Sequence, residues 1–166
     1  MEFNAWRKKL PDIFENVKKD VWKTIKRHRA GLVLGLIEMG MRNGGFIGGM
    51  FFSGGTMILM NTTPLRIILG DQPNNIVWAY TYHILLHEYV HSLGTYDENK
   101  TRLICLQISE ETFKDQDHPA VIIAKRGIGA FFPNLPLVYA PMNFNPSNLK
   151  IDVVKEFDKS SQTYFS

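Results

Sequence analysis

The segment HEYVHSLGTYDE, residues 87–98, carries side chains that could bind a metal ion and do chemistry beside it. His87 and His91 are four residues apart, so on an α-helix they share one face and can bind one cation. Glu88 is rotated by one residue, where it can border the metal without ligating it. Zinc lowers the pKa of a bound water towards ~7, and a nearby carboxylate can pass its proton to a leaving amine. The H-E-x-x-H spacing therefore predicts metal-assisted hydrolysis.

The helix that carries these residues is expected to be buried. Residues 75–93 contain no helix breaker, and polar residues clustered on a buried helix indicate a site. The alternative is that the histidines are exposed or are satisfied within the core. His83, four residues before His87, either lines a cleft or is such a core histidine, and we assign no role to His28 or His118. The apolar side chains of this helix include Val77, Trp78, Ile84, Leu85, Val90 and Leu93.

The stretch HEYVHSLGTYD resembles the pattern H-E-x-x-H-x-x-G-x-x-H/D of the metzincins, a branch of the zincin metallopeptidases. Asp at the last position makes it most similar to the snapalysin branch. The resemblance implies a Zn²⁺ ion held by His87, His91 and Asp97, with one position left open for water. It also implies a sharp turn at Gly94 and a methionine-containing turn beneath the metal, for which Met142 in YAPMNF is the candidate.

The identity of the third ligand has alternatives. Asp97 could instead cap the following helix. Glu98 is the neighbouring acid that could take its place, or it could instead pair with Arg102 one helical turn later. A resemblance to the gluzincins, where a glutamate 19 or 20 residues beyond the second histidine completes the site, implies Glu110 or Glu111. If the second helix starts at Asp97, however, Glu110 lies roughly 12 Å beyond the point opposite the motif's centre, at 1.5 Å per residue.

The rest of the chain predicts an α+β fold. Apolar runs bounded by glycines predict strands at 31–39, 46–53 and 56–61, the last two joined by a tight turn at Gly54-Gly55. Helices are expected over 4–29, from Thr63 as an N-cap to 69, over 75–93, from the cap Asp97 to 113, and over 147–159. Residues 118–148 are expected to be irregular, with a strand or two.

The zincin resemblance implies how these elements are arranged. It implies a small, twisted, mostly antiparallel or mixed sheet packed on the active-site helix, with further helices around it. It also implies that an edge strand binds the substrate peptide in extended form. Residues 56–61, the last strand before the motif helix, are the candidate for that edge.

Composition indicates one soluble domain over residues 1–166, because 45% of the residues are hydrophobic and 21% are charged. Cys105 is the only cysteine, which excludes a disulfide framework and a cysteine-based zinc site and favours a cytoplasmic protein. Residues 43–65 lack charge, but their paired glycines suit turns between strands, so no transmembrane segment is expected.

The net charge of +3 arises mostly from residues 1–29, a basic amphipathic helical segment. We interpret its basic face as solvated and expect no nucleic-acid partner. The sequence therefore predicts a zinc-dependent metallopeptidase that acts on a peptide or protein, with Glu88 as the general base. The alternatives are a non-catalytic zinc-binding protein of the same fold and a protein that binds partners through its basic surface.

Overall fold

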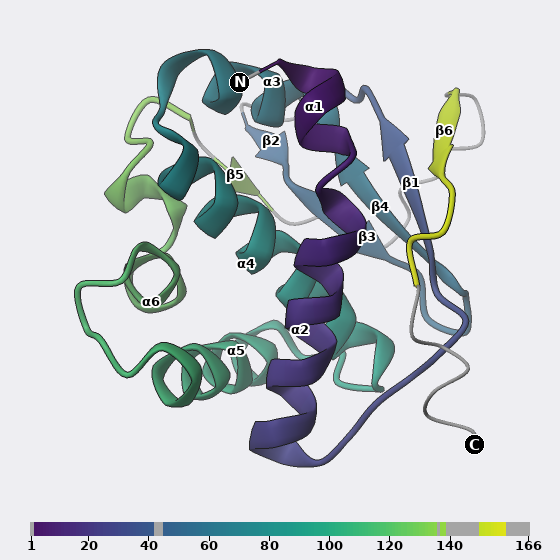
Figure 1. Ribbon diagram of the computed structural model, residues 1–166, viewed down its shortest axis with the longest axis vertical. Helices are drawn as coiled ribbons and strands as arrows, with labels where there is room; N and C mark the ends of the chain where they lie inside the picture. The colour runs from purple at the N-terminus through teal and green to yellow at the C-terminus, as the bar shows by residue number, and fades with distance from the viewer. Residues whose placement is uncertain (1, 42–44, 136, 139–149, 159–166) are drawn as a thin grey trace.

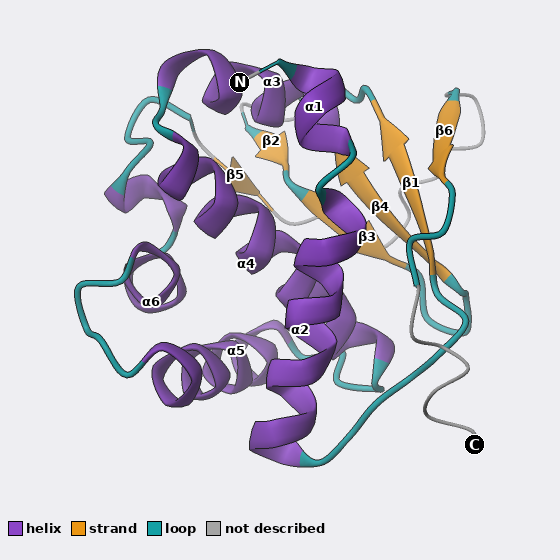
Figure 2. Cartoon of the chain, viewed as in Figure 1, coloured by secondary structure: helices purple, strands orange, loops and turns teal. Residues whose placement is uncertain are grey.

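The computed structural model describes residues 2–41, 45–135, 137–138 and 150–158, which form an α+β fold. Helices gather on one side of a small mixed sheet (Figures 1 and 2). The helices are α1 (Phe3–Arg7), α2 (Leu10–Ile25), α3 (Thr62–Asp71), α4 (Asn74–Ser92), α5 (Glu98–Phe113), α6 (Pro119–Arg126) and the 3₁₀ turn η1 (Ile128–Ala130). The strands are β1 (Val33–Ile37), β2 (Phe46–Ile47), β3 (Gly49–Phe51), β4 (Met57–Asn61), β5 (Leu137–Val138) and β6 (Ile151–Val154).

The four-stranded sheet has the order β3-β4-β1-β6. Strands β1 and β4 are parallel, whereas β3 and β6 run antiparallel to their neighbours. Strands β2 and β5 form a separate parallel pair. The sheet is small and mixed, which agrees with the expected fold class. The turn at Gly54, where φ is +80°, joins β3 to β4 as expected.

The strand expected at the substrate-binding edge is in fact an interior strand. Residues 57–61 form β4, which has β3 on one side and β1 on the other. Ile58, Leu59 and Met60 are all buried, and a run of apolar residues without alternation is typical of a strand covered on both faces. The edge strand beside α4 is β3, so the assignment of 56–61 to the edge is wrong.

Helix α4 lies at the centre of the core. All its residues from Ile84 to Ser92 are buried, with α2, α5 and α6 packed around it and the sheet beyond (Figure 1). The N-terminal helices belong to the same core, because the Trp6 indole donates a hydrogen bond to Oγ1 of Thr81 over 3.1 Å. The predicted amphipathic character of this segment is confirmed: its apolar face is buried and Lys8, Lys9, Lys19 and Lys23 are exposed.

Lys18 departs from that pattern, because its side chain is fully buried. Its ammonium group pairs with Glu15 over 3.0 Å and with Asp158. Asp158 in turn accepts hydrogen bonds from the backbone N–H groups of Gly31 and Leu32. A buried ion pair thus joins α2 to the segment that follows β6.

Three local expectations are corrected by the structure. Within the range 147–159, Ile151–Val154 is strand β6 and not helix; its β-branched residues favour a strand, and it pairs with β1. The segment expected to be irregular contains α6, which starts at Pro119. Helix α3 is capped by Asn61, whose side chain accepts from the N–H of Thr63, so Thr63 is not the cap. Met142 lies outside the described residues.

Among the helices of the described part of the chain, we find none with both the length and the apolar character needed to cross a membrane.

Candidate metal centre

The two histidines of the motif lie on consecutive turns near the C-terminus of α4. The ring centroids of His87 and His91 are 4.7 Å apart, and both side chains are buried. The helix ends two residues before Gly94, whose φ of +105° suits glycine. The chain reverses there, as predicted, and α5 starts at Glu98 and packs against α4.

The carboxylate of Glu98 lies against both imidazoles. Its Oε2 atom is 2.9 Å from Nε2 of His87, and its Oε1 atom is 3.0 Å from Nε2 of His91. The ligands of a tetrahedral zinc ion, with bonds of about 2.0–2.1 Å, lie about 3.3 Å from one another. Each histidine nitrogen therefore lies from an oxygen of Glu98 at nearly the separation of two ligands of one ion.

The other acids considered as third ligands make different contacts. Asp97 is the N-cap of α5: its Oδ1 atom accepts a hydrogen bond from the N–H of Lys100 over 2.8 Å. Because α5 begins at Glu98, the side chain of Asp97 is turned to the end of its own helix, and Glu98 is the acid that reaches α4. Farther along α5, Glu110 accepts from Gln116 and Glu111 accepts from Gln107. The structure therefore places neither Asp97 nor these two glutamates against the histidines.

The orientation of His91 is fixed by the turn that follows α4. Its Nδ1 atom lies 2.7 Å from the carbonyl oxygen of Thr95, which can only accept, so Nδ1 carries the proton. The Nε2 atom is then the ring nitrogen that faces Glu98 and is the one that could bind a metal. The buried hydroxyl of Thr101 donates to the same carbonyl over 3.1 Å, which holds that carbonyl in place.

Glu88 is buried beside the histidines. Within the part of the chain that the structure describes, its Oε2 atom is buried with no hydrogen-bond partner. Burial raises the pKa of Glu88 to about 7; the adjacent His87 lowers the pKa and the charge of Glu98 raises it. His87, Glu88 and His91 form a group whose ligand atoms all lie within 4.8 Å of one another, and this group could hold a metal ion.

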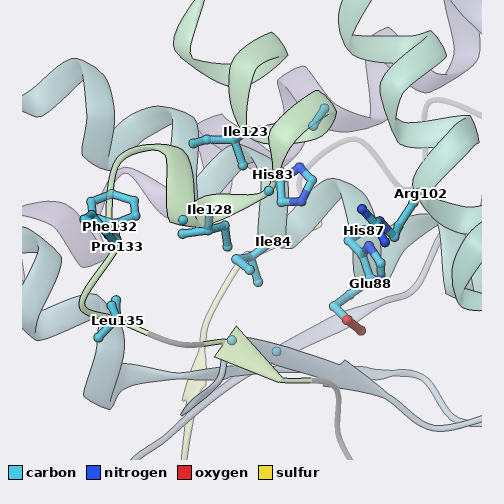
Figure 3. Close-up of a pocket in the computed structure, with 15 residues that line it drawn as sticks. His83, Ile84, His87, Glu88, Arg102, Ile123, Ile128, Phe132, Pro133 and Leu135 are labelled. Carbon is cyan, nitrogen blue, oxygen red and sulfur yellow. The ribbon is translucent and has the colours of Figure 1, made fainter. Parts of the chain in front are cut away.

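A pocket of about 470 Å³ opens beside this group (Figure 3). His87, Glu88 and Arg102 stand at one end, and Phe132, Pro133 and Leu135 close the other, with apolar residues between. The volume is within the range of about 300–1,000 Å³ that is typical of ligand sites. His87 and Glu88 therefore border a cavity large enough for part of a small ligand.

His83 also lines this pocket, which agrees with the interpretation that it lines a cleft. Burial, together with the charges of His87 and Arg102, lowers the pKa of His83 to about 3, so the ring is neutral. Its Nδ1 atom has no hydrogen-bond partner among the described residues.

Gly48, Gly49 and the side chain of Arg102 line the pocket, although the sequence did not predict them there. A Cβ at Gly49 would lie 2.9 Å from Cγ2 of Ile84 and 3.3 Å from Cγ of Glu88, so only glycine lets β3 lie this close to α4. The pair Gly48-Gly49 inside a predicted strand was a usable signal, because such glycines often mark a close approach of two backbones. Arg102 was considered only as an ion-pair partner of Glu98, because its place beside the pocket depends on how α5 packs.

Comparison with known proteins finds no relative: no family profile, curated protein or solved structure matches this chain. The fold and the site are therefore interpreted from the chain's own residues.

Proposed function

We propose that the chain is a zinc-dependent metallopeptidase in which His87, His91 and Glu98 hold the metal and Glu88 is the general base. The observation that carries this proposal is the carboxylate of Glu98, whose two oxygens lie 2.9 and 3.0 Å from the Nε2 atoms of the two histidines. Two imidazoles and one carboxylate are a donor set used by catalytic zinc sites, which leave a fourth position open. Glu98 thus replaces Asp97 as the proposed third ligand.

The roles of the chain's own residues follow from their positions. When bound, zinc would supply a Lewis acid that polarises the peptide carbonyl and makes water more acidic. Glu88 borders both the histidines and the pocket, so its carboxylate can take a proton from the attacking water and deliver it to the departing amine. The peptide C–N bond breaks, the water oxygen goes to the acyl carbon, and the proton goes to the nitrogen.

Strand β3 is the proposed binding surface for the substrate backbone. It is one of the two outer strands of the four-stranded sheet, and Gly49 lies against Ile84 and Glu88 of α4. A peptide that adds to this edge as an extended strand would run past Glu88, and backbone hydrogen bonds would hold it regardless of sequence.

The site favours hydrolysis over a purely structural metal. A structural zinc site is closed by four protein ligands, so it binds no water that an adjacent carboxylate could deprotonate. Here Glu88 lies next to the donor set, and a pocket opens beside it.

The test compares the wild-type protein with Glu88→Gln. We expect both to bind one zinc ion per chain, as measured by elemental analysis after dialysis. We expect cleavage of an unfolded protein substrate by Glu88→Gln to be about 10²–10⁴-fold slower, the usual contribution of a general base. Glu111→Gln, on the exposed side of α5, is the matched control and should cleave normally. Wild-type cleavage rates in Glu88→Gln, or no zinc in the wild-type protein, would contradict the proposal.

A further inference from the structure

The pocket beside the metal group contains a positive charge without a counter-ion. Arg102 lines the pocket from α5, and among the described residues no carboxylate forms an ion pair with it. Glu98, one helical turn earlier, is the acid that would ordinarily pair with it, but its carboxylate lies against the histidines. The guanidinium group is therefore available to a ligand.

A second donor lines the same cavity. The imidazole of His83 also lines the pocket, and its Nδ1 atom is buried without a hydrogen-bond partner in the described structure. A neutral imidazole carries one N–H that it can donate, and Arg carries five. Apart from Glu88, the described side chains that line the pocket include no acid. These donors favour an anion, and the planar guanidinium fork matches a carboxylate.

The remaining wall of the pocket is apolar. Side chains from α4, α6, η1 and the segment after it face the cavity (Figure 3). Burying a large aliphatic or aromatic side chain there would be favourable, because it removes apolar surface from water. The apolar side chains are Ile84, Ile123, Ala124, Ile128, Phe132 and Leu135.

The polar end and the apolar wall of the pocket are placed so that one amino-acid residue could bind its carboxylate to the first and its side chain to the second. Figure 3 shows Arg102 beside His87 and Glu88, with Ile84 and Ile128 farther along the cavity. Arg102 is four residues after Glu98, which is about 6 Å along the helix axis. A carboxylate held by Arg102 would therefore lie one or two residues from a peptide carbonyl at the metal group, because a residue spans about 3.5 Å.

We propose that Arg102 binds the free α-carboxylate of a peptide substrate whose C-terminal residue places a large apolar side chain in the pocket. This inference rests on the proposed peptidase function and specifies it: cleavage falls one or two bonds from a C-terminus that ends in a residue such as leucine or phenylalanine. Arg102 is then a specificity-determining residue, and the pocket selects the end of a chain over its middle.

The cleavage test uses one peptide that ends in leucine, prepared with a free carboxylate and with a C-terminal amide. We expect wild-type kcat/KM to be at least tenfold higher for the free acid, mainly through a lower KM. Arg102→Gln should lose this preference, and Arg102→Lys should keep part of it. Arg126→Gln, an exposed arginine at the end of α6, is the matched control and should keep the full preference. Equal rates on acid and amide in the wild-type protein would overturn the inference.

A binding test separates failure of the inference from failure of the proposed function. N-acetyl-leucine and N-acetyl-leucinamide are titrated into the metal-free protein, and amide resonances of the pocket are followed by NMR. We expect the acid to bind at least tenfold more tightly than the amide, and this difference to vanish in Arg102→Gln. If the protein cleaves peptides with no preference for the free end, the peptidase assignment holds and the inference is wrong. If it cleaves nothing, the peptidase assignment is wrong, and the titration still decides whether Arg102 binds a carboxylate.

Discussion

The Oε2 atom of Glu98 lies 2.9 Å from the Nε2 atom of His87, although the two residues belong to different helices. The contact exists because α4 ends two residues before Gly94 and α5 begins at Glu98, so the first turn of α5 faces the last turns of α4. Asp97, one residue earlier, is used to cap α5. A difference of one residue in the chain thus separates a possible ligand from a helix cap.

Replacing Glu98 should weaken metal binding far more than replacing Asp97. We expect Glu98→Ala to lose zinc affinity by about 100-fold or more, because even partners of the ligands contribute about 10–100-fold. Asp97→Asn should keep both the cap and the affinity, since asparagine is also a good N-cap residue. Competition titrations with a chromophoric chelator measure both constants. A larger loss in Asp97→Asn than in Glu98→Ala would restore Asp97 as the ligand.

The hydroxyl of Thr101 should matter to the metal through His91. Thr101 holds the Thr95 carbonyl that accepts the proton of His91 Nδ1. We expect Thr101→Val to reduce zinc affinity by about tenfold, and to cost about 1 kcal/mol of stability, because a hydrogen bond is lost without a large change in volume. Thr101→Ser retains the hydroxyl and serves as the control. Chelator titration and urea denaturation give the two values, and equal affinities of the valine and serine variants would exclude this role.

The close approach of β3 to α4 should make Gly49 intolerant of a side chain. A Cβ there would lie 2.9 Å from Ile84 and 3.0 Å from the backbone oxygen of Leu59, which cannot rotate away. We expect Gly49→Ala to cost about 1–3 kcal/mol in urea denaturation, as overpacking does. Gly70→Ala, in α3 with no atom within 4 Å of its Cβ, should be neutral or stabilise by up to ~1 kcal/mol. A Gly49→Ala variant as stable as the wild type would show that β3 can move away.

His118 should make the stability contributed by the N-terminal cap of α6 depend on pH. Its Nδ1 atom accepts a hydrogen bond from the N–H of Ala120 over 3.1 Å, which only an unprotonated ring can do. Burial lowers the pKa of His118, against an opposing effect of Asp115, so the unfolded chain takes up the proton more readily. The stability contributed by this cap is therefore complete above the unfolded pKa of about 6.5 and is lost as the pH falls below it.

The measurement compares wild type with His118→Asn and His118→Ala by denaturation between pH 5 and pH 8. We expect His118→Asn, which caps without titrating in this range, to lose less stability than the wild type on acidification. His118→Ala should cost about 1 kcal/mol at pH 8 and less at pH 5. Parallel curves for wild type and His118→Asn would mean that His118 does not titrate with folding.

The elements with strong local signals were predictable from the sequence. Strands β1 and β4 and helices α4 and α5 lie close to their expected positions, because apolar periodicity, Gly94 and the cap Asp97 are all local features. The histidine pair and Glu88 needed only the helical repeat, and the structure brings them together.

What the sequence could not supply depends on pairing between distant segments. Strand β6 was expected to be helical because its short run does not reveal that β1 would pair with it. The edge position of β3 follows from the strand order, which no local pattern contains. The preference for Asp97 over Glu98 came from a family pattern, whereas the geometry depends on which residue begins α5.

The residues that would hold the ion all come from a short stretch, 87–98, that closes on itself through one turn. Closing so short a loop costs little entropy, so a denatured chain keeps part of its attraction for the ion. A ligand that also binds the unfolded ensemble raises the melting temperature less than its affinity for the native protein would suggest. Differences in melting temperature between cations will therefore understate the differences in their affinity for this protein. Direct titration of the folded chain is the measurement that separates them.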